Sequence, residues 1–324
     1  MSPPRLTPIS ALDIRSDGSA VRVAGSWPDP KPAEGFAWRW LHLDLSDPGL
    51  ADWLEAHLPM VAMDALLQVE TRPRCTPLGD GLIVNLRGVN LNPGAKAEDM
   101  VSLRIWLAAD LAVTVRMRRL YAVEDLRRAA EAGNAPPNPG DFIAALSEGL
   151  TDRLESVSIA LDDATDALEE AILEEERDEA GDDVAPLRRK ALRLRRFAGP
   201  QREALVRLAE GPGAFLGQEA RTLLGESANR TTRAVEELDS ASARLTALND
   251  HLDNQQGARM ARNGFVLSVV ASIFLPLGFL TGLFGVNVAG MPGMTWPWAF
   301  AALAVANVVL ALFLVVLFRA LKWF

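Results

Sequence analysis

Two long apolar runs near the C-terminus constrain this chain more than any other feature of its sequence. Residues 264–284 and 296–318 contain no charged side chain. As helices, each would be roughly 31–35 Å long, enough to cross a hydrocarbon core of about 30 Å. Because lipid offers no hydrogen bonds, a spanning segment must satisfy its own backbone, which favours a helical hairpin. The alternative is a soluble protein that buries the hairpin, but two uncharged runs of this length are rare in soluble domains.

The charges that flank the two runs predict their orientation. Arg259 and Arg262 precede the first run, Arg319 and Lys322 follow the second, and the connecting loop has neither lysine nor arginine. Positively charged flanks stay on the cytoplasmic side of a membrane. We therefore expect a multi-pass protein with both termini in the cytoplasm and the loop outside.

Composition narrows the classes of function. The chain has 42 acidic against 33 basic residues, a net charge of −9, which argues against a nucleic-acid partner. One cysteine, Cys75, excludes an intramolecular disulfide and fits a reducing cytoplasm. No nucleophile–base pair, phosphate-binding glycine loop or metal triad is recognisable, so we expect no enzyme. The widely spaced His42, His57 and His251 offer no local zinc site and are interpreted as ordinary residues.

The pattern along the chain predicts three parts. Residues 1–140 are expected to form a cytoplasmic α/β domain, residues 141–262 a helical hairpin with a long stalk helix, and residues 263–324 the transmembrane hairpin. In the first part, alternating or β-branched runs predict strands at 38–45, 81–89, 100–109 and 111–117. Helices are predicted there at 51–58 and 122–133.

The second part should be almost wholly helical. An acidic helix runs to about Ala180, GDD turns the chain, and a basic helix starts near Pro186. An antiparallel pairing would lay the acidic helix along the basic one. Two interpretations stay open, namely mutually neutralising solvated faces or an acidic surface that attracts cations.

The last helix is predicted to run from about Gly217 to Phe284, on the order of 100 Å. Leucines on a seven-residue register predict a coiled-coil-like seam; these are Leu224, Leu238, Leu245 and Leu252. A second register holds small or weakly polar residues seven apart, with further members at half-steps. Its members are Asp250, Gly257, Gly264, Ser268, Ala271, Leu275, Gly278, Gly282 and Gly285.

This second register, which we call the small-residue face, has two interpretations. Small side chains allow close helix packing, or they leave room for a hydrated ion in a water-filled path. A single hairpin cannot enclose a path, so a pore would require an oligomer around this face. Asp250 is its one ionisable group near the membrane entrance, either as part of a cation-attracting ring or as a solvated stalk residue.

The stretch IFLPLGFLTGLFGVNVAGMPG (273–293), which ends the stalk helix and precedes one more span, resembles the CorA metal-transporter superfamily. Gly285-Val286-Asn287 stands where that superfamily carries Gly-Met-Asn, and this variant is similar to its ZntB branch, associated with zinc. The segments WLHLDLSDP (40–48), ETRPR (70–74), GLIVNLRGVNLNPG (81–94) and EDMVSLRIW (98–106) resemble that branch too.

The resemblance implies a homopentamer in the bacterial inner membrane, with a cytoplasmic funnel and five copies of the long helix around a pore. The small-residue face would line that pore, and the second spans would face lipid. Gly285, Val286 and Asn287 would form the outer mouth, where Asn287 offers amide oxygens to a hydrated cation. The transported ion would be Zn²⁺ (or Mg²⁺), with no tightly bound cofactor, and protons are a candidate coupling ion.

Two alternatives remain open. Val286 replaces the methionine of the magnesium channels, yet a magnesium or broad-range divalent-cation channel is still compatible with the sequence. In a different class, the chain could be a membrane-anchored helical scaffold or sensor. The uncharged loop and the small-residue face favour transport, because a simple tether needs neither.

Overall fold

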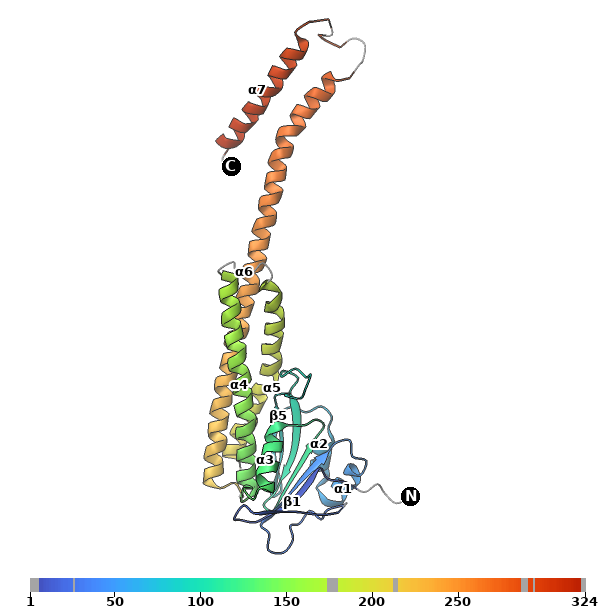
Figure 1. Cartoon of the computed structure of the whole chain (residues 1–324), viewed down its shortest axis with the longest axis vertical. Coiled ribbons are helices and arrows are strands. Elements are labelled where there is room, and N and C mark those ends of the chain that lie inside the picture. The colour runs from blue at the N-terminus through green and yellow to red at the C-terminus, as the bar shows by residue number, and fades with distance from the viewer. Residues whose placement is uncertain are drawn as a thin grey trace. The chain divides into compact units, whose positions relative to one another are not determined.

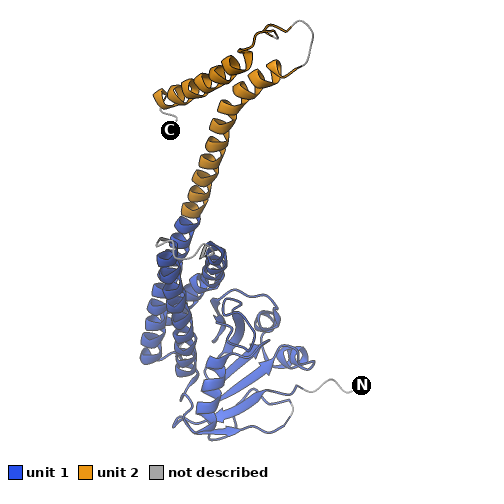
Figure 2. Ribbon diagram, turned by 45° about the horizontal axis from the view of Figure 1, so that its top comes forward, with its two compact units in different colours: residues 1–249 blue, residues 250–324 orange. Residues whose placement is uncertain are grey.

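The computed structural model describes residues 6–25, 27–173, 180–211, 215–286, 291–293 and 295–321. These residues divide into two compact units, residues 1–249 and 250–324 (Figure 2). Helix α6 (Gln218–Phe284) runs through the boundary between the units. The predicted division into three parts, with limits at residues 140 and 262, stays a prediction.

The first unit contains a seven-stranded mixed sheet (Figure 1). The strands are β1 (Ser10–Ile14), β2 (Ala20–Arg22), β3 (Trp38–Asp44), β4 (Arg74–Leu78), β5 (Gly81–Gly88), β6 (Val101–Leu107) and β7 (Leu111–Arg116). Their order is β2-β1-β3-β7-β6-β5-β4. The pair β3–β7 is parallel and the other described pairs are antiparallel.

Helices cover both faces of this sheet, which explains why its central strands are apolar on both sides. One face packs against α1 (Leu50–His57) and α2 (Met60–Leu67), around the buried Trp53. The other face packs against α3 (Tyr121–Glu131) and the start of the helical part, around Trp38, Trp40 and Phe142. This two-sided core is the layered α/β domain that the sequence predicts.

The four predicted strands and two predicted helices of this domain are confirmed, with ends that differ by two residues or fewer. Strands β1, β2 and β4 and helix α2 were not predicted from the sequence. Strand β4 contains Pro77, which suits an edge strand but weakens the strand signal. Strand β2 has only three residues. Helix α2 follows Pro59 at its N-cap, a start signal that its short apolar run did not reinforce.

The helical part of the first unit comprises α4 (Pro139–Leu173), η1 (Ala180–Asp183), α5 (Val184–Glu210) and the beginning of α6. Helix α6 has 67 residues, so the predicted length of about 100 Å is confirmed. The leucine seam packs inward: Leu224, Leu238 and Leu245 are fully buried, whereas Leu252 is partly exposed. Leu154, Leu161 and Leu194 from α4 and α5 share a buried cluster with Leu238.

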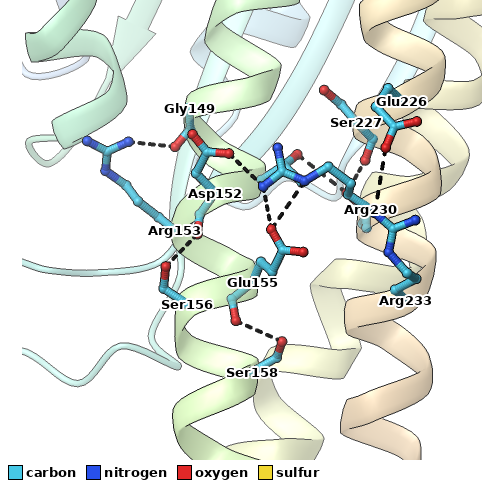
Figure 3. Close-up of polar contacts among 12 residues, drawn as sticks. Gly149, Asp152, Arg153, Glu155, Ser156, Ser158, Glu226, Ser227, Arg230 and Arg233 are labelled. Carbon is cyan, nitrogen blue, oxygen red and sulfur yellow. Dashed lines mark hydrogen bonds and ion pairs between the residues drawn. The ribbon is translucent and has the colours of Figure 1, made fainter.

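The charged side chains of these helices pair differently from the expectation. Arg230 of α6 lies between Asp152 and Glu155 of α4, with 2.7 Å from its Nη2 to Asp152 Oδ1 (Figure 3). Two heptads further along α6, Arg244 forms ion pairs with Asp162, Asp166 and Glu169 of α4. Among the described residues, no ion pair joins α4 to α5.

The described carboxylates of α4 that form ion pairs with another helix therefore pair with α6 rather than with the basic helix, and residues 174–179 of the predicted acidic helix lie outside the described residues. In α5, Arg195 pairs with Asp239 of α6 at 2.8 Å, and Arg193 with Asp99 of the β5–β6 loop at 3.0 Å. Arg230 and Arg244 lie on the side of α6 that faces α4, so their guanidinium groups contact its carboxylates, whereas Arg233 pairs with Glu226 within α6.

The second unit contains the end of α6 and α7 (Ala299–Ala320). By length and composition, both helices could cross a membrane, and the most apolar window of each is unburied within the structure. The ends at Phe284 and Ala320 lie within two residues of the predicted span ends. The predicted membrane hairpin is thus present as two helices.

Candidate functional site

The small-residue face keeps its predicted register because α6 is helical without interruption to Phe284. All nine of its residues, from Asp250 to Gly285, are exposed in the single chain. At 100° per residue, a spacing of seven drifts by about 20°, so these positions stay within a stripe about 100° wide on one side of the helix. The structure therefore brings these residues to one side of α6 and leaves that side uncovered.

The glycines of this face are not explained by packing within the chain. A Cβ atom added at Gly257, Gly264, Gly278 or Gly282 would meet no atom within 4 Å beyond the adjacent backbone of its own helix. Glycine in a helix interior costs about 1 kcal/mol relative to alanine, so an unneeded glycine is disfavoured. Four such positions on one stripe need a cause outside the chain, either a close neighbour or a space that must stay open.

Helix α7 covers the opposite side of α6. Within the span, the partly covered residues of α6 include Val269, Ile273, Pro276 and Leu280. Their mean direction lies about 150° away from that of the small-residue face, at 100° per residue. On α7 the less exposed positions recur in the same way, at Leu303, Asn307 and Phe318 among others. The hairpin thus leaves the small-residue face free for another molecule or for solvent.

Hydroxyl groups in this helix are satisfied by its own backbone. Ser268 Oγ donates to the carbonyl of Gly264 at 2.9 Å, and Thr281 Oγ1 donates to the carbonyl of Leu277 at 3.0 Å. Such bonds let a hydroxyl lie in an apolar environment while its oxygen still accepts a further hydrogen bond. Ser268 can therefore offer an oxygen to a passing hydrated ion without leaving an unpaired donor.

The predicted mouth is only partly described. Gly285 follows the last residue of α6, and a Cβ there would lie 2.9 Å from the carbonyl oxygen of Thr281. Glycine at this position thus has a local cause, the crowding at the helix end. Val286 is half exposed. Asn287, the proposed oxygen ligand, lies outside the described residues.

A dehydrated zinc ion finds no ready-made site in the described part of the chain, where no three His, Cys, Asp or Glu side chains converge. His42 is fully buried, and its Nδ1 lies 2.8 Å from Thr114 Oγ1. Burial, followed by the charge of Arg116, lowers the pKa of His42 to about 3. It is a neutral core residue, whereas His251 is exposed and lies 2.9 Å from the side chain of Gln255.

Helix α7 carries a polar residue that was not predicted as part of a site. Asn307 of α7 donates from Nδ2 to the carbonyl of Leu303 at 3.0 Å, and its buried Oδ1 has no hydrogen-bond partner among the described residues. An amide inside an apolar span was the available signal. The unpaired oxygen lies on the less exposed side of α7, not on the small-residue face.

The fold and this arrangement match known proteins over almost the whole chain. Residues 36–320 match the family described as CorA-like Mg²⁺ transporter protein. The zinc transport protein ZntB of Yersinia enterocolitica is 36% identical over 286 residues, which cover 88% of this chain and 87% of that protein. The divalent cation transporter CmaX of Pseudomonas aeruginosa is 39% identical over 292 residues, with the same coverage of 88% and 87%.

Solved structures of related proteins have the same fold as this chain. The structure of full-length CmaX superposes with a TM-score of 0.81 at 35% identity and covers 100% of both chains. The CorA magnesium transporter of Methanocaldococcus jannaschii, at 16% identity, has a TM-score of 0.77 and covers 98% of this chain and 100% of that one. The latter likeness shows the common fold. The chain therefore belongs to the CorA-like Mg²⁺ transporter family, close to the members named ZntB and CmaX, as the sequence resemblance predicts.

Proposed function

We propose that this protein carries divalent cations across a membrane and that Zn²⁺ is its main cargo. Membership of a transporter family supports the first statement, and the names of the relatives, zinc transport protein and divalent cation transporter, support the second. The observation that carries the proposal is the small-residue face of α6. Its glycines are open to solvent in the single chain, and no contact within the chain requires them.

The path needs several copies of the chain. One hairpin covers the far side of α6 with α7 and encloses nothing, so five copies would place their small-residue faces around a common axis. The second spans would then face lipid. In this homopentamer Gly257, Gly264, Ala271, Gly278 and Gly282 line the pore, with Ser268 and Leu275 between them. A closed ring uses the same face of every copy, which a repeated register along one helix supports.

The chemistry of the face suits an ion that keeps its water. Between Gly264 and Phe284 no side chain is ionisable, and the polar groups available are hydroxyls and backbone. Bare Zn²⁺ prefers nitrogen and sulfur ligands, and these residues supply neither. A hydrated ion instead needs weak oxygen contacts that it can leave again. Asn287, Val286 and Gly285 would form the outer mouth, and five copies of the exposed Asp250 would attract cations at the cytoplasmic side.

Orientation and coupling follow from the charges. Arginines precede the first span and follow the second. Under the positive-inside rule, both termini would therefore lie on the cytoplasmic side of a bacterial inner membrane. A proton relay through the bilayer normally uses intramembrane carboxylates or histidines, and neither predicted span has one. Protons would then act through water or through Asp250 rather than along a fixed chain of titratable groups.

Metal uptake into proteoliposomes tests the proposal. The purified chain should take up Zn²⁺ above the level of protein-free vesicles, and Asn287→Ala should depress uptake sharply while insertion and assembly persist. Mg²⁺ measured in parallel decides between a zinc transporter and a magnesium or broad-range channel. Asp250→Asn should weaken the dependence of flux on an imposed pH gradient. If no divalent cation enters, the chain is a scaffold or sensor and the proposal is wrong.

A further inference from the structure

A polar cavity in the first unit has no part in the proposed ion path. It has a volume of about 650 Å³ and is formed by three separate segments: the β5–β6 loop, the β7–α3 loop and the middle of α5. These segments supply Lys96, Arg118, Arg119 and Arg193, against one carboxylate, Asp99. The cavity therefore gathers four cationic side chains that are far apart in the sequence.

Most of this positive charge is not compensated within the chain. Arg193 pairs with Asp99 at 3.0 Å, and Arg119 has a long contact of 3.9 Å to Glu124 and lies over the ring of Tyr121. Lys96 and Arg118 are exposed and take part in none of the ion pairs between described residues. Unpaired cations that converge on a concave surface create a local positive potential that attracts anions.

The loop that bears Lys96 is held in shape, so the cavity is formed before any ligand arrives. Asn92 Nδ2 donates to Asn90 Oδ1 at 2.7 Å and to the carbonyl of Arg119 at 3.0 Å, which ties the β5–β6 loop to the β7–α3 loop. Asn90 also lines the cavity; it is 2% exposed, and its Nδ2 has no hydrogen-bond partner in the described part of the chain. A buried amide donor without a partner is costly unless a ligand satisfies it.

We propose that this cavity binds a small, multiply charged phosphate anion such as a polyphosphate chain. Arginine and lysine supply charge-assisted hydrogen bonds to phosphate oxygens, and an amide donor adds a neutral one. The volume lies within the range of small-molecule sites. None of the lining residues is aromatic, so the cavity offers no surface for stacking a nucleobase. Recognition rests on the phosphates, and the bound anion links the two loops to α5.

Binding of inorganic tripolyphosphate to the purified full-length chain tests this site. Calorimetric titration in buffer freed of divalent cations should show saturable binding at one site per chain. Lys96→Gln with Arg118→Gln should weaken that binding at least about tenfold, because two charge-assisted contacts are lost. Both side chains are exposed and unpaired, so the melting temperature without ligand should stay unchanged.

The matched control removes two positive charges elsewhere. Arg22→Gln with Lys31→Gln alters exposed residues outside the cavity and gives the same net charge, and its affinity should equal that of the unaltered chain. If both double variants bound tripolyphosphate equally weakly, the effect would come from overall charge, and the proposed site would be wrong. The absence of saturable binding would also overturn it. Lipid headgroups share this chemistry, so water-soluble short-chain phosphatidylglycerol serves as competitor. Displacement of tripolyphosphate at equal phosphate concentration would overturn the assignment to a soluble anion.

Discussion

Asp13 and Arg39 form a bidentate ion pair inside the first unit. They are direct partners in the register of β1 and β3, with 2.6 Å from Nε to Oδ1 and 2.7 Å from Nη2 to Oδ2. Their side chains are 5% and 6% exposed. A buried pair adds little net stability, yet removal of one partner leaves a buried charge without compensation.

Asp13→Asn should therefore destabilise the first unit by about 3–5 kcal/mol. Asp239→Asn breaks an exposed pair with Arg195, in which both side chains are about half exposed, and should cost less than about 1 kcal/mol. Thermal unfolding of both variants, followed by tryptophan fluorescence, provides the comparison. Equal losses of stability would show that the burial of the Asp13–Arg39 pair has no energetic weight.

His42 makes the stability of the same unit depend on pH. The unfolded chain takes up a proton near the ordinary pKa of 6.5, whereas burial keeps the folded side chain neutral down to about 3. Between these values the unfolded state binds more protons, so stability falls as the pH falls, by at most about 1.4 kcal/mol per pH unit.

His42→Gln should remove this contribution and flatten the pH dependence of the melting temperature between pH 6.5 and the acid limit of folding. Because other groups also titrate, the quantity to compare is the difference between the variant and the unaltered chain at each pH. A simple packing defect would lower the melting temperature by the same amount at every pH. A constant difference across the window would therefore contradict the buried, neutral state of His42.

At the scale of the elements, α4 is fixed to α6 by two arginine clusters. Arg230 and Arg244 are two heptads apart on α6, and Glu237, midway between them, accepts a hydrogen bond from Ser158 of α4 at 2.7 Å. Arg244 contacts three carboxylates, so its loss would leave Asp162, Asp166 and Glu169 facing one another. Like charges at this separation repel.

Arg244→Gln should destabilise the first unit by about 1–2 kcal/mol at low ionic strength, and by less at 1 M salt, where the repulsion is screened. Arg233→Gln is the matched control, because Arg233 pairs within α6 with Glu226 at 3.6 Å and has no ion pair to α4. Denaturation curves at the two salt concentrations measure both effects. A loss that does not depend on salt would point to packing rather than charge.

The sequence predicts the elements of this chain better than their pairing. Alternating or β-branched apolar runs located β3, β5, β6 and β7, since buried central strands carry the strongest apolar signal. Edge strands such as β4 are short, polar or interrupted by proline, and their existence depends on a neighbour that the sequence does not name. The partners of the α4 carboxylates could not be predicted for the same reason, because net charge does not indicate that two arginines of α6, a helix of mixed charge, contact α4 where the basic α5 does not.

The small-residue face could be predicted from the sequence because residue spacing alone decides which residues share one side of a helix. Residues such as Gly264 and Gly278 share one side of α6 in any uninterrupted helix, and the structure adds that α7 lies opposite them. The anion-binding cavity was not predictable, because Lys96, Arg118 and Arg193 meet only through the sheet topology. Gly285 has a local cause at the helix end that its spacing alone does not reveal.

For the whole molecule, the central claim is that the small-residue face of α6 lines a path for cations in an oligomer. The chain alone leaves this face exposed, and its family consists of metal-ion transporters. Both facts are explained together if five copies meet around this face. Such a path requires open space beside the small-residue face. A bulky side chain at one position of this face should therefore block the path without changing the rest of the protein.

Zinc flux through Gly278→Leu proteoliposomes tests this expectation. A Cβ at Gly278 meets nothing within the chain, so the hairpin should fold, and five leucines should occlude the path. Ala304→Leu adds similar bulk at an exposed position of α7, which the account places toward lipid. We predict that Gly278→Leu abolishes Zn²⁺ flux while native mass spectrometry still shows five copies of the 35.1 kDa chain, and that Ala304→Leu retains flux. Undiminished flux through an intact Gly278→Leu pentamer would contradict the account.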